Sequence, residues 1–254
     1  MSNVQSLERA LTILNKLSDY PDGIQIARLS EQVSLSKSTV HRLLATLSNM
    51  NYVVKDSESD KYKLGLQVLF LSRNILNNND IVNTAKPYLE RLSHEVNETV
   101  HLCIEDRGEI VYIDKIESNQ TIRMFSRVGN RAPMYCTAVG KILYSGMESG
   151  HFEELVSKVN FIPKTESTIT TPEGLREEIN KIKKQKYALD NIENEEGIRC
   201  IAAPIYNHTG KIIASFSISG PSNRVTMDKI NDTLIDKMRQ TSLDISRNLG
   251  YIGS

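Results

Sequence analysis

Small polar and basic side chains occupy one face of a predicted helix between residues 34 and 47 of this 254-residue chain. Apolar residues recur there at intervals of three and four, which predicts a helix with a single apolar face. They are Val40, Leu43, Leu44 and Leu47, and the opposite face carries Lys37, Ser38, Thr39, His41, Arg42 and Thr46. Ser36 is placed to cap the helix by accepting a hydrogen bond from a first-turn amide. Such side chains at a helix N-terminus can meet phosphates and base edges together.

The neighbouring residues predict the elements that would position this helix. Residues 23–33 have the apolar spacing of a short helix, and residues 34–36 form a connection of the length that a helix-turn-helix requires. Two β-prone runs, 52–55 and 61–64, flank a polar stretch and predict a hairpin. Together they predict a winged helix-turn-helix on double-stranded DNA, with an ordinary surface helix beside a hairpin as the alternative. The residues expected at DNA are Ser36, Lys37, Ser38, Thr39, His41, Arg42, Lys55 and Lys61.

Composition adds little to the case for DNA and excludes several other classes. The chain has 31 Lys plus Arg and 31 Asp plus Glu, and residues 1–65 hold eight basic and seven acidic side chains. A DNA surface must therefore depend on a local basic face. The sequence has no signal peptide and no apolar run long enough to span a membrane, which predicts a cytoplasmic protein. Cys103, Cys136 and Cys200 have no metal-ligand spacing, so no zinc site or other cofactor is expected.

Two further apolar helices accompany this domain. Residues 5–20 follow a helical period. Residues 66–76 are apolar over most of a helical circumference, which is typical of a helix buried on several sides. We interpret the helix at 66–76, together with the helix at 5–20, as a connecting and dimerising element. The alternative is that the helix at 66–76 is buried within its own chain. The polar run 77–80 breaks the pattern, which predicts a DNA-binding domain at 1–65, a linker helix at 66–79 and a second domain at 80–254.

The second domain alternates strands and helices. A helix at 81–96 contains Pro87, which predicts a kink or a restart. Strands are expected at 99–104, 109–116, 121–126, 187–190, 200–206 and 211–219, and helices after Cys136 or Thr137, at 175–185 and, as one or two helices, over 227–249. Thr171 followed by Pro172 has the form of an N-cap with proline at the first helical position, ahead of the helix at 175–185. The segment 127–133 is expected to be a loop. Because several of the strands are joined by hairpins, we expect an α+β domain around an antiparallel sheet.

Three N-terminal segments resemble the signature of a known family. They are QSLERALTIL from Gln5, SKSTVHRLL from Ser36 and YKLG from Tyr62. They look like the start of the IclR family of bacterial transcription regulators, and the similarity continues over nearly the whole chain. Members of that family have a winged-helix domain, a linker helix and an effector-binding domain related to the GAF and PAS sensor folds. The resemblance implies the same architecture here.

Three C-terminal segments resemble the ligand cradle of the same family: 133–143, 187–205 and 215–221. The first starts a helix, whose free amides suit a carboxylate. Ser217 and Ser219 are two apart and so project from one face of a strand. Position by position, the resemblance implies contacts to a small carboxylic acid. These come from amides of Ala138 and Val139, from side chains of Asp190, Cys200, Ser217 and Ser219, and from apolar walls at Met124, Ala132 and Ile198.

Plainer roles exist for the same residues, and two positions depart from the family pattern. The serines could bond within a sheet, Cys200 could fill a core, and Asp190 could belong to a solvated acidic loop. Ala132 stands where many relatives have a larger aliphatic residue, and Asn191 stands where they often have a further acid. A roomier wall would admit a longer or ring-shaped acid, so the effector stays open.

The sequence therefore favours a ligand-responsive transcription regulator that represses a catabolic operon. A homodimer or homotetramer would bind a near-palindromic operator, and a small organic acid would modulate that binding. The alternatives are a hydrolase-like enzyme with an accessory helix-turn-helix and a winged helix used for protein contacts. Catalysis needs a nucleophile beside an oriented base, and His101, His151 and His208 stand apart in sequence with nothing to orient them. No enzyme activity is expected.

Overall fold

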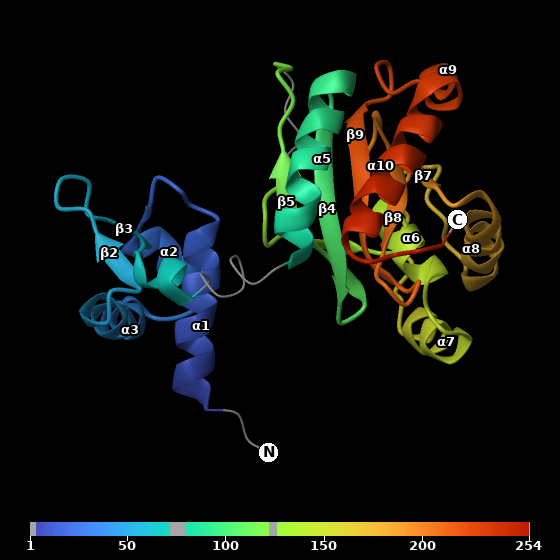
Figure 1. The fold of residues 1–254 in the computed structure, drawn as a ribbon. Coiled ribbons are helices and arrows are strands. Elements are labelled where there is room, and N and C mark those ends of the chain that lie inside the picture. The colour runs from blue at the N-terminus through green and yellow to red at the C-terminus, as the bar shows by residue number, and fades with distance from the viewer. Residues whose placement is uncertain (1–3, 72–79, 122–125, 254) are drawn as a thin grey trace. The chain divides into compact units, whose positions relative to one another are not determined.

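The computed structural model describes residues 4–71, 80–121 and 126–253, which form two compact units that meet at Asn79 and Asp80 in the sequence (Figure 1). Each unit has a hydrophobic core of its own. The predicted linker helix is helical over 67–71, and its continuation at 72–79 lies outside the described residues. Within the described ranges no helix is long and apolar enough to cross a membrane.

The N-terminal unit is the predicted winged helix-turn-helix. Its helices are α1 (Gln5–Ser18), α2 (Ile26–Gln32) and α3 (Lys37–Asn49), and they pack around Ile13, Leu29 and Leu44, which are fully buried. The wing is the antiparallel pair β2 (Val53–Lys55) and β3 (Lys61–Leu64). A short strand that the sequence did not predict, β1 (Ile24–Gln25), pairs with the free edge of β3 and fixes the wing beside α2.

In the described part of the C-terminal unit, six antiparallel strands form the sheet, in the order β6-β5-β4-β9-β8-β7. They are β4 (Thr99–Asp106), β5 (Glu109–Ile116), β6 (Arg131–Pro133), β7 (Ala188–Asn191), β8 (Ile198–Tyr206) and β9 (Ile212–Pro221). Arg107 and Gly108 both have positive φ, as a tight turn between β4 and β5 requires. The expected α+β class with an antiparallel sheet is confirmed.

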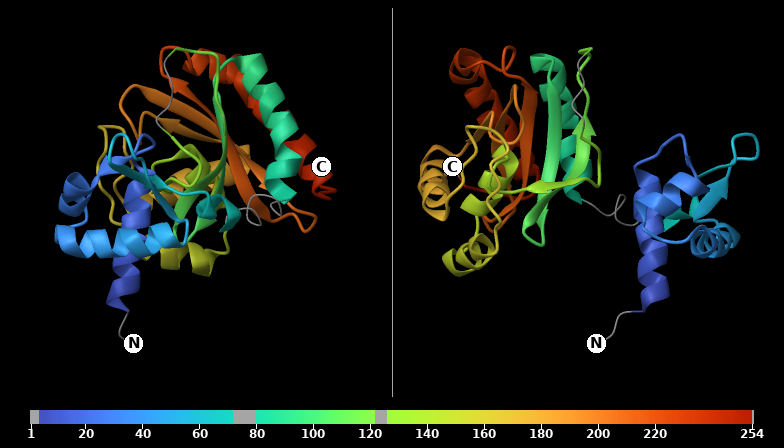
Figure 2. Two further views of the ribbon diagram at one scale, coloured as in Figure 1. Left: turned by 90° about the vertical axis from the view of Figure 1, so that its left-hand side faces the viewer. Right: turned by 180° about the vertical axis from the view of Figure 1, so that it is seen from behind.

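Helices cover both faces of this sheet (Figures 1 and 2). On one face α5 (Asp80–Val96) and α10 (Ile235–Asn248) pack against each other and the strands. On the other face lie α6 (Ala138–Ser145), α7 (Ser149–Ser157) and α8 (Pro172–Gln185). Strand β9 separates the two sides, because Phe216 and Ile218 join the α5–α10 core while Ser215, Ser217 and Ser219 alternate with them. All five of these side chains are buried, so the serines lie inside the molecule.

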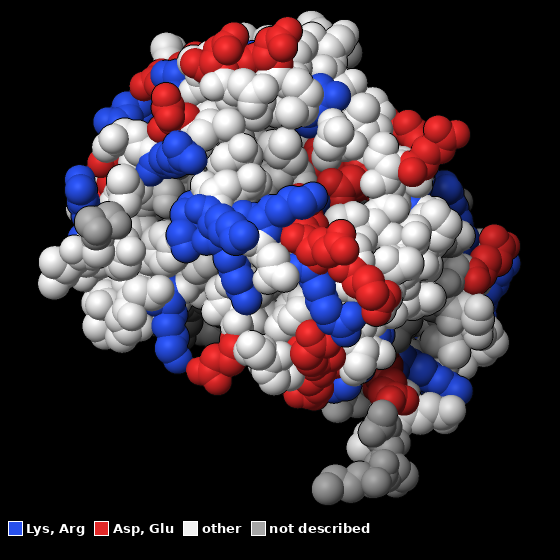
Figure 3. Space-filling view, turned by 90° about the vertical axis from the view of Figure 1, so that its right-hand side faces the viewer, with Lys and Arg blue, Asp and Glu red and all other residues white. Residues whose placement is uncertain are grey.

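Helix α8 shows how charge is distributed on the outer surface. As expected, it begins after Thr171, whose hydroxyl accepts a hydrogen bond from the Gly174 amide, with Pro172 in the first turn. Its apolar stripe is buried, and its Lys and Glu side chains, except the half-buried Glu178, are exposed. Figure 3 looks onto the side of the C-terminal unit where α8 lies, and basic and acidic groups are interspersed over that face. This mixture agrees with a net charge of zero.

Several local expectations were wrong. Helix α7 was not predicted, and residues 131–133, expected to be loop, form β6 because they pair with β5. Of the kink or restart expected at Pro87, the restart does not occur: α5 continues through Pro87, since fully buried Ala85 and Leu89 hold it to the sheet on either side. The closing helix is α9 (Met227–Lys229), a π turn (Ile230–Leu234) and α10. The strand expected at 121–126 falls largely outside the described residues.

Candidate DNA-binding surface and effector site

Helix α3 presents its N-terminal end to solvent. Ser36 caps it by accepting a hydrogen bond from the Thr39 amide at 3.3 Å, as the sequence predicted. Val40 and Leu44 are fully buried and fix the rotation of the helix on its core. This rotation leaves the DNA candidates facing outward: Ser36, Lys37, Ser38, His41 and Arg42 are exposed, and Thr39 is half-buried.

The wing supplies lysines of different availability. Lys55 is exposed, but its ammonium group lies 2.5 Å from an Asp60 carboxylate oxygen and over the Tyr62 ring. Lys61 is half-buried at the start of β3. In the described part of the chain neither Lys61 nor Arg42 has an acidic partner. Arg42 and Lys61 are therefore better placed than Lys55 to meet a phosphate or a base.

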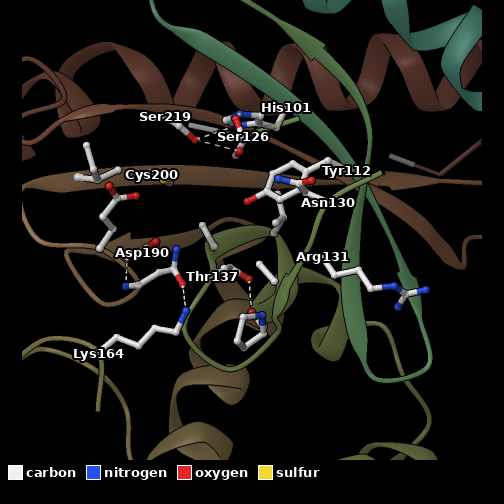
Figure 4. Close-up of a pocket in the computed structure, with 18 residues that line it drawn as sticks. His101, Tyr112, Ser126, Asn130, Arg131, Thr137, Lys164, Asp190, Cys200 and Ser219 are labelled. Atoms are coloured by element: carbon white, nitrogen blue, oxygen red, sulfur yellow. Dashed lines mark hydrogen bonds between the residues drawn. The ribbon is translucent and has the colours of Figure 1, made fainter. Parts of the chain in front are cut away.

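A polar cavity of about 250 Å³ lies in the C-terminal unit, on the α6 side of the sheet (Figure 4). It brings together residues that are up to 118 positions apart in the sequence. Eight of the nine expected effector residues line it: Ala132, Ala138, Val139, Asp190, Ile198, Cys200, Ser217 and Ser219. The ninth, Met124, lies outside the described residues. We refer to this space as the polar cavity.

Strand register explains why these side chains converge. Asp190 is paired with Cys200 across β7 and β8, and Cys200 is paired with Ser219 across β8 and β9. The three residues therefore form one row across the sheet. The next row on the same face contains Ser217 and His101, which are paired across β9 and β4. The wall of the polar cavity is thus built from consecutive rows of an antiparallel sheet.

His101 connects three serine hydroxyl groups in this wall. Its Nδ1 lies 3.2 Å from Ser219 Oγ and its Nε2 lies 2.6 Å from Ser126 Oγ, while Ser217 Oγ is 3.3 Å from Ser219 Oγ. Burial, with a smaller contribution from the charge of Lys115, lowers the pKa of His101 to about 3. The imidazole is therefore neutral, with one donor and one acceptor nitrogen. The sequence offered nothing to orient a histidine toward a nucleophile, but the fold brings two serine hydroxyls to the ring nitrogens of His101, and among the described residues no carboxylate bonds to the ring.

Asp190 is the acidic group of the wall, and it is buried. Its Oδ1 accepts hydrogen bonds from the backbone amides of Glu193 at 2.7 Å and Asn194 at 3.3 Å. These bonds favour the ionised form, but burial outweighs them and raises the pKa of Asp190 to about 7. Near neutral pH the carboxyl group can therefore either donate or accept a hydrogen bond.

Helix α6 points its first turn at the polar cavity. Thr137 caps it by accepting from the Gly140 amide at 3.3 Å and donates to the carbonyl oxygen of Pro133. Ala138 and Val139 are the first two residues of the helix, so their amides have no acceptor within it. A Cβ atom at Gly140 would come within 2.4 Å of Met134 backbone atoms, so only glycine lets the helix approach this turn.

Two cationic residues line the polar cavity in different ways. Lys164 donates from Nζ to Asn194 Oδ1 at 2.9 Å and so lies at the loop that borders the space. Arg131 points away in Figure 4 and pairs with Asp106 and Glu109. The helix amides and Lys164 can together hold a carboxylate, opposite a wall of serine hydroxyls, a neutral imidazole and the Asp190 carboxyl group.

Sequence reasoning missed several lining residues, among them His101, Tyr112, Ser126, Asn130, Lys164 and Asn194. Alternation along β4 places His101 opposite to Val100 and Leu102, so its face could be inferred. Its neighbours could not, because β4 pairs with β9 more than 100 residues later.

A winged helix-turn-helix with an exposed recognition helix, joined to a separate α+β domain, defines an HTH-type transcriptional regulator. Residues 6–57 match the IclR helix-turn-helix domain, and residues 73–247 match the C-terminal domain of the bacterial transcriptional regulator IclR. The chain belongs to the IclR family, which confirms the resemblance found in its sequence, and its partner is operator DNA.

Relatives similar to this chain cover almost all of it. The HTH-type transcriptional regulators KdgR and XynR of Escherichia coli K12 are each 36% identical to it, over 98% and 99% of this chain and 94% and 99% of theirs. The crystal structure of the Thermotoga maritima IclR has a TM-score of 0.82 and 33% identity, and the match covers 98% of this chain and 100% of that one. These proteins are transcriptional regulators, which confirms that the chain is not an enzyme.

Proposed function

We propose that this regulator is a repressor of a catabolic operon, and that a small carboxylic acid bearing hydroxyl groups modulates its operator binding from the polar cavity. The observation that carries the proposal is the opposition of two chemistries in one cavity. Free amides of Ala138 and Val139 with Lys164 lie on one side, and serine hydroxyls, the neutral imidazole of His101 and the carboxyl group of Asp190 lie on the other. Oriented amides suit an anion, and the hydrogen-bonding wall suits hydroxyl groups.

The proposed effector contacts divide by chemistry. The carboxylate of the acid would accept from the two amides and Lys164, and its hydroxyls would bond to Asp190, Ser217 and Ser219. Ala132, Ile198 and Cys200 would form apolar walls and set the size of the ligand. A volume near 250 Å³ suits a small metabolite rather than a large cofactor.

The DNA-binding part of the proposal rests on α3 and the wing. The major groove would receive side chains at the N-terminal end of α3, and the DNA backbone would meet two lysines of the wing. The groove residues are Ser36, Lys37, Ser38, Thr39, His41 and Arg42, and the wing residues are Lys55 and Lys61.

The proposed domains are residues 1–65, which bind DNA, residues 66–79, which form a linker helix, and residues 80–254, which bind the effector. The proposed assembly is a cytoplasmic homodimer or homotetramer. Two relatives named as repressors support repression rather than activation: YiaJ of E. coli K12 is 32% identical to this chain, and the acetate operon repressor of Salmonella typhimurium LT2 is 28% identical.

The test combines a ligand screen with designed variants. Small carboxylic acids and their uncharged amides are screened by thermal shift, and the best acid is titrated calorimetrically. Asp190→Ala and Ser217→Ala are expected to weaken its binding by about 1 to 3 kcal/mol, because each leaves a ligand group without its partner. Ser157→Ala, at an exposed serine of α7, is the matched control.

Operator binding is measured alongside in a gel-shift assay with upstream DNA. Since the two sites communicate only through their coupling free energy, Asp190→Ala should leave effector-free operator affinity nearly unchanged while reducing the response to the acid. Equal binding of the acid by wild type and both variants would remove these residues from the site. Loss of operator binding without effector would assign Asp190 a structural role instead.

A further inference from the structure

The loop between β7 and β8 borders the polar cavity in a conformation that its sequence disfavours. Ile192 has a φ of +63°, in the left-handed region that a β-branched residue rarely adopts. Such a residue keeps this geometry only where surrounding contacts over-determine it. Glycine or asparagine would adopt the same φ at little cost. The conformation of Ile192 therefore depends on the contacts of its neighbours.

A buried ion pair supplies the strongest of these contacts. Lys141, on α6, is fully buried, and its Nζ lies 2.6 Å and 2.9 Å from the two carboxylate oxygens of Glu193. One of these oxygens also accepts from the Asn191 amide at 3.2 Å. Glu178 of α8 is a more distant second acid, 3.9 Å from Nζ. A lysine without solvent access needs a counter-charge, so Glu193 is drawn inward, one residue after the strained position.

Glu193 in turn fixes the residues that face the polar cavity. Its amide and that of Asn194 donate to Asp190 Oδ1, and its carbonyl oxygen accepts from Thr168 Oγ1 at 2.6 Å. Asn194 Oδ1 accepts from Lys164 and, at 3.5 Å, from the buried thiol of Cys136. Lys141 lies one turn along α6 from Ala138. One side chain therefore connects the helix whose amides face the cavity to the loop on its far side.

We propose that Lys141 is a positioning residue which, through Glu193, holds loop 190–197 closed beside the polar cavity with Asp190 and Asn194 in place. The proposal deepens the effector site and rests on that proposed function for its biological meaning. The ion pair acts by making an otherwise unfavourable loop conformation the stable one. Without it, Ile192 relaxes to negative φ and the loop moves away from Cys136.

The proposal is tested on the ligand-free full-length protein. Burial raises the pKa of the Cys136 thiol to about 12, so the thiol reacts only when the loop opens. Labelling of each cysteine is followed by mass spectrometry, and Cys103, fully buried in the core, reports global unfolding. Hydrogen exchange over residues 190–197 is measured in parallel. The variants are Lys141→Met and the double variant Lys141→Met/Glu193→Met, with Lys158→Met, which breaks an exposed pair with Glu154, as the control.

Both variants are expected to label Cys136 about tenfold faster than wild type and to lose protection in the loop, while Cys103 stays unreactive. The double variant separates positioning from stability, because apolar replacement of both charges leaves no unpaired charge in the core. It should melt near the wild-type temperature and still have an open loop. A merely structural ion pair would leave loop exchange normal once stability was restored.

If the double variant labels Cys136 and exchanges its loop amides at wild-type rates, the proposal is overturned, even if Lys141→Met alone fails to fold. Equal acceleration by Lys158→Met would overturn it as well. Because no effector is used, these outcomes are independent of the acid screen: a failed screen would leave the loop result intact, and a normal loop would leave acid binding intact.

Discussion

At the scale of single residues, the titration of Asp190 makes the free energy of unfolding depend on pH in a direction that its raised pKa determines. Burial raises its pKa from 3.8 to about 7 in the folded chain, so between these pH values the folded state binds a proton that the unfolded state lacks. The contribution of Asp190 to the free energy of unfolding therefore falls as pH rises from about 4 to about 7, by an amount on the order of 4 kcal/mol, and is constant outside that window. Buried His101, whose pKa is lowered to about 3, contributes a slope of the opposite sign, so the Asp190 contribution is read from the difference between wild type and an Asp190 variant.

Asp190→Asn should remove most of this dependence, because an amide does not titrate. Unfolding by urea at pH 4.5, 6.0 and 7.5 measures it. Burial also raises the pKa of Glu193, which contributes a slope of the same sign and remains in the variant. Glu196→Gln, at an exposed acid of the same loop, is the control. Parallel pH profiles for wild type and Asp190→Asn would contradict a raised pKa.

Some features of the site residues could be predicted from the sequence, and others could not. The sequence placed Ser217 and Ser219 on one strand face and the amides of Ala138 and Val139 at a helix start, since both inferences need only local geometry. It did not find the bond of His101 to Ser219, which arises from the pairing of β4 with the distant strand β9, or the bond to Ser126, which lies outside the strands. The pKa values of Asp190 and His101 depend on burial, which follows only from the assembled core.

At the scale of elements, α3 and the wing are expected to read DNA in different ways. If Arg42 makes a bidentate base contact, Arg42→Ala should cost about 1 to 3 kcal/mol and relax specificity at one position per half-site. Lys61→Ala should instead weaken binding to all sequences and reduce the slope of log affinity against log salt by about one. Gel shifts on operator and scrambled DNA at several salt concentrations separate the two effects.

The control for these variants is Lys86→Ala, which removes one positive charge from α5 in the other unit. It should leave both affinity and salt slope unchanged. If Arg42→Ala behaves like the control, Arg42 is not a recognition residue.

Elements were predictable where their ends are set by local bonds. The caps at Ser36 and Thr171 were expected, and each side chain accepts the amide three residues later. Short elements were not predictable: β1 has two residues and β6 has three, and both exist only because a longer strand offers them an edge. Propensity carries too little information over so few residues to outweigh such pairing.

At the scale of the whole molecule, the N-terminal unit leaves a set of apolar side chains in water. Leu7 and Leu11 on α1 are 58% and 51% exposed, and Leu66 and Leu71 at the start of the linker are 79% and 55% exposed. Their own domain therefore does not bury these four side chains. Large exposed apolar side chains grouped in one small domain are typical of an interface with another chain.

We expect this surface to join two copies of the chain. Leu7→Glu and Leu71→Glu each place a charge in the proposed interface, so light scattering after size exclusion should show a smaller assembly than wild type. Operator affinity should fall by about 100-fold or more, because two linked half-site contacts become one. Met50→Glu, at a side chain 57% exposed elsewhere in the unit, is the matched control. An unchanged mass for both leucine variants would place the interface on another surface, and a reduced mass with full operator affinity would show that one winged helix suffices for binding.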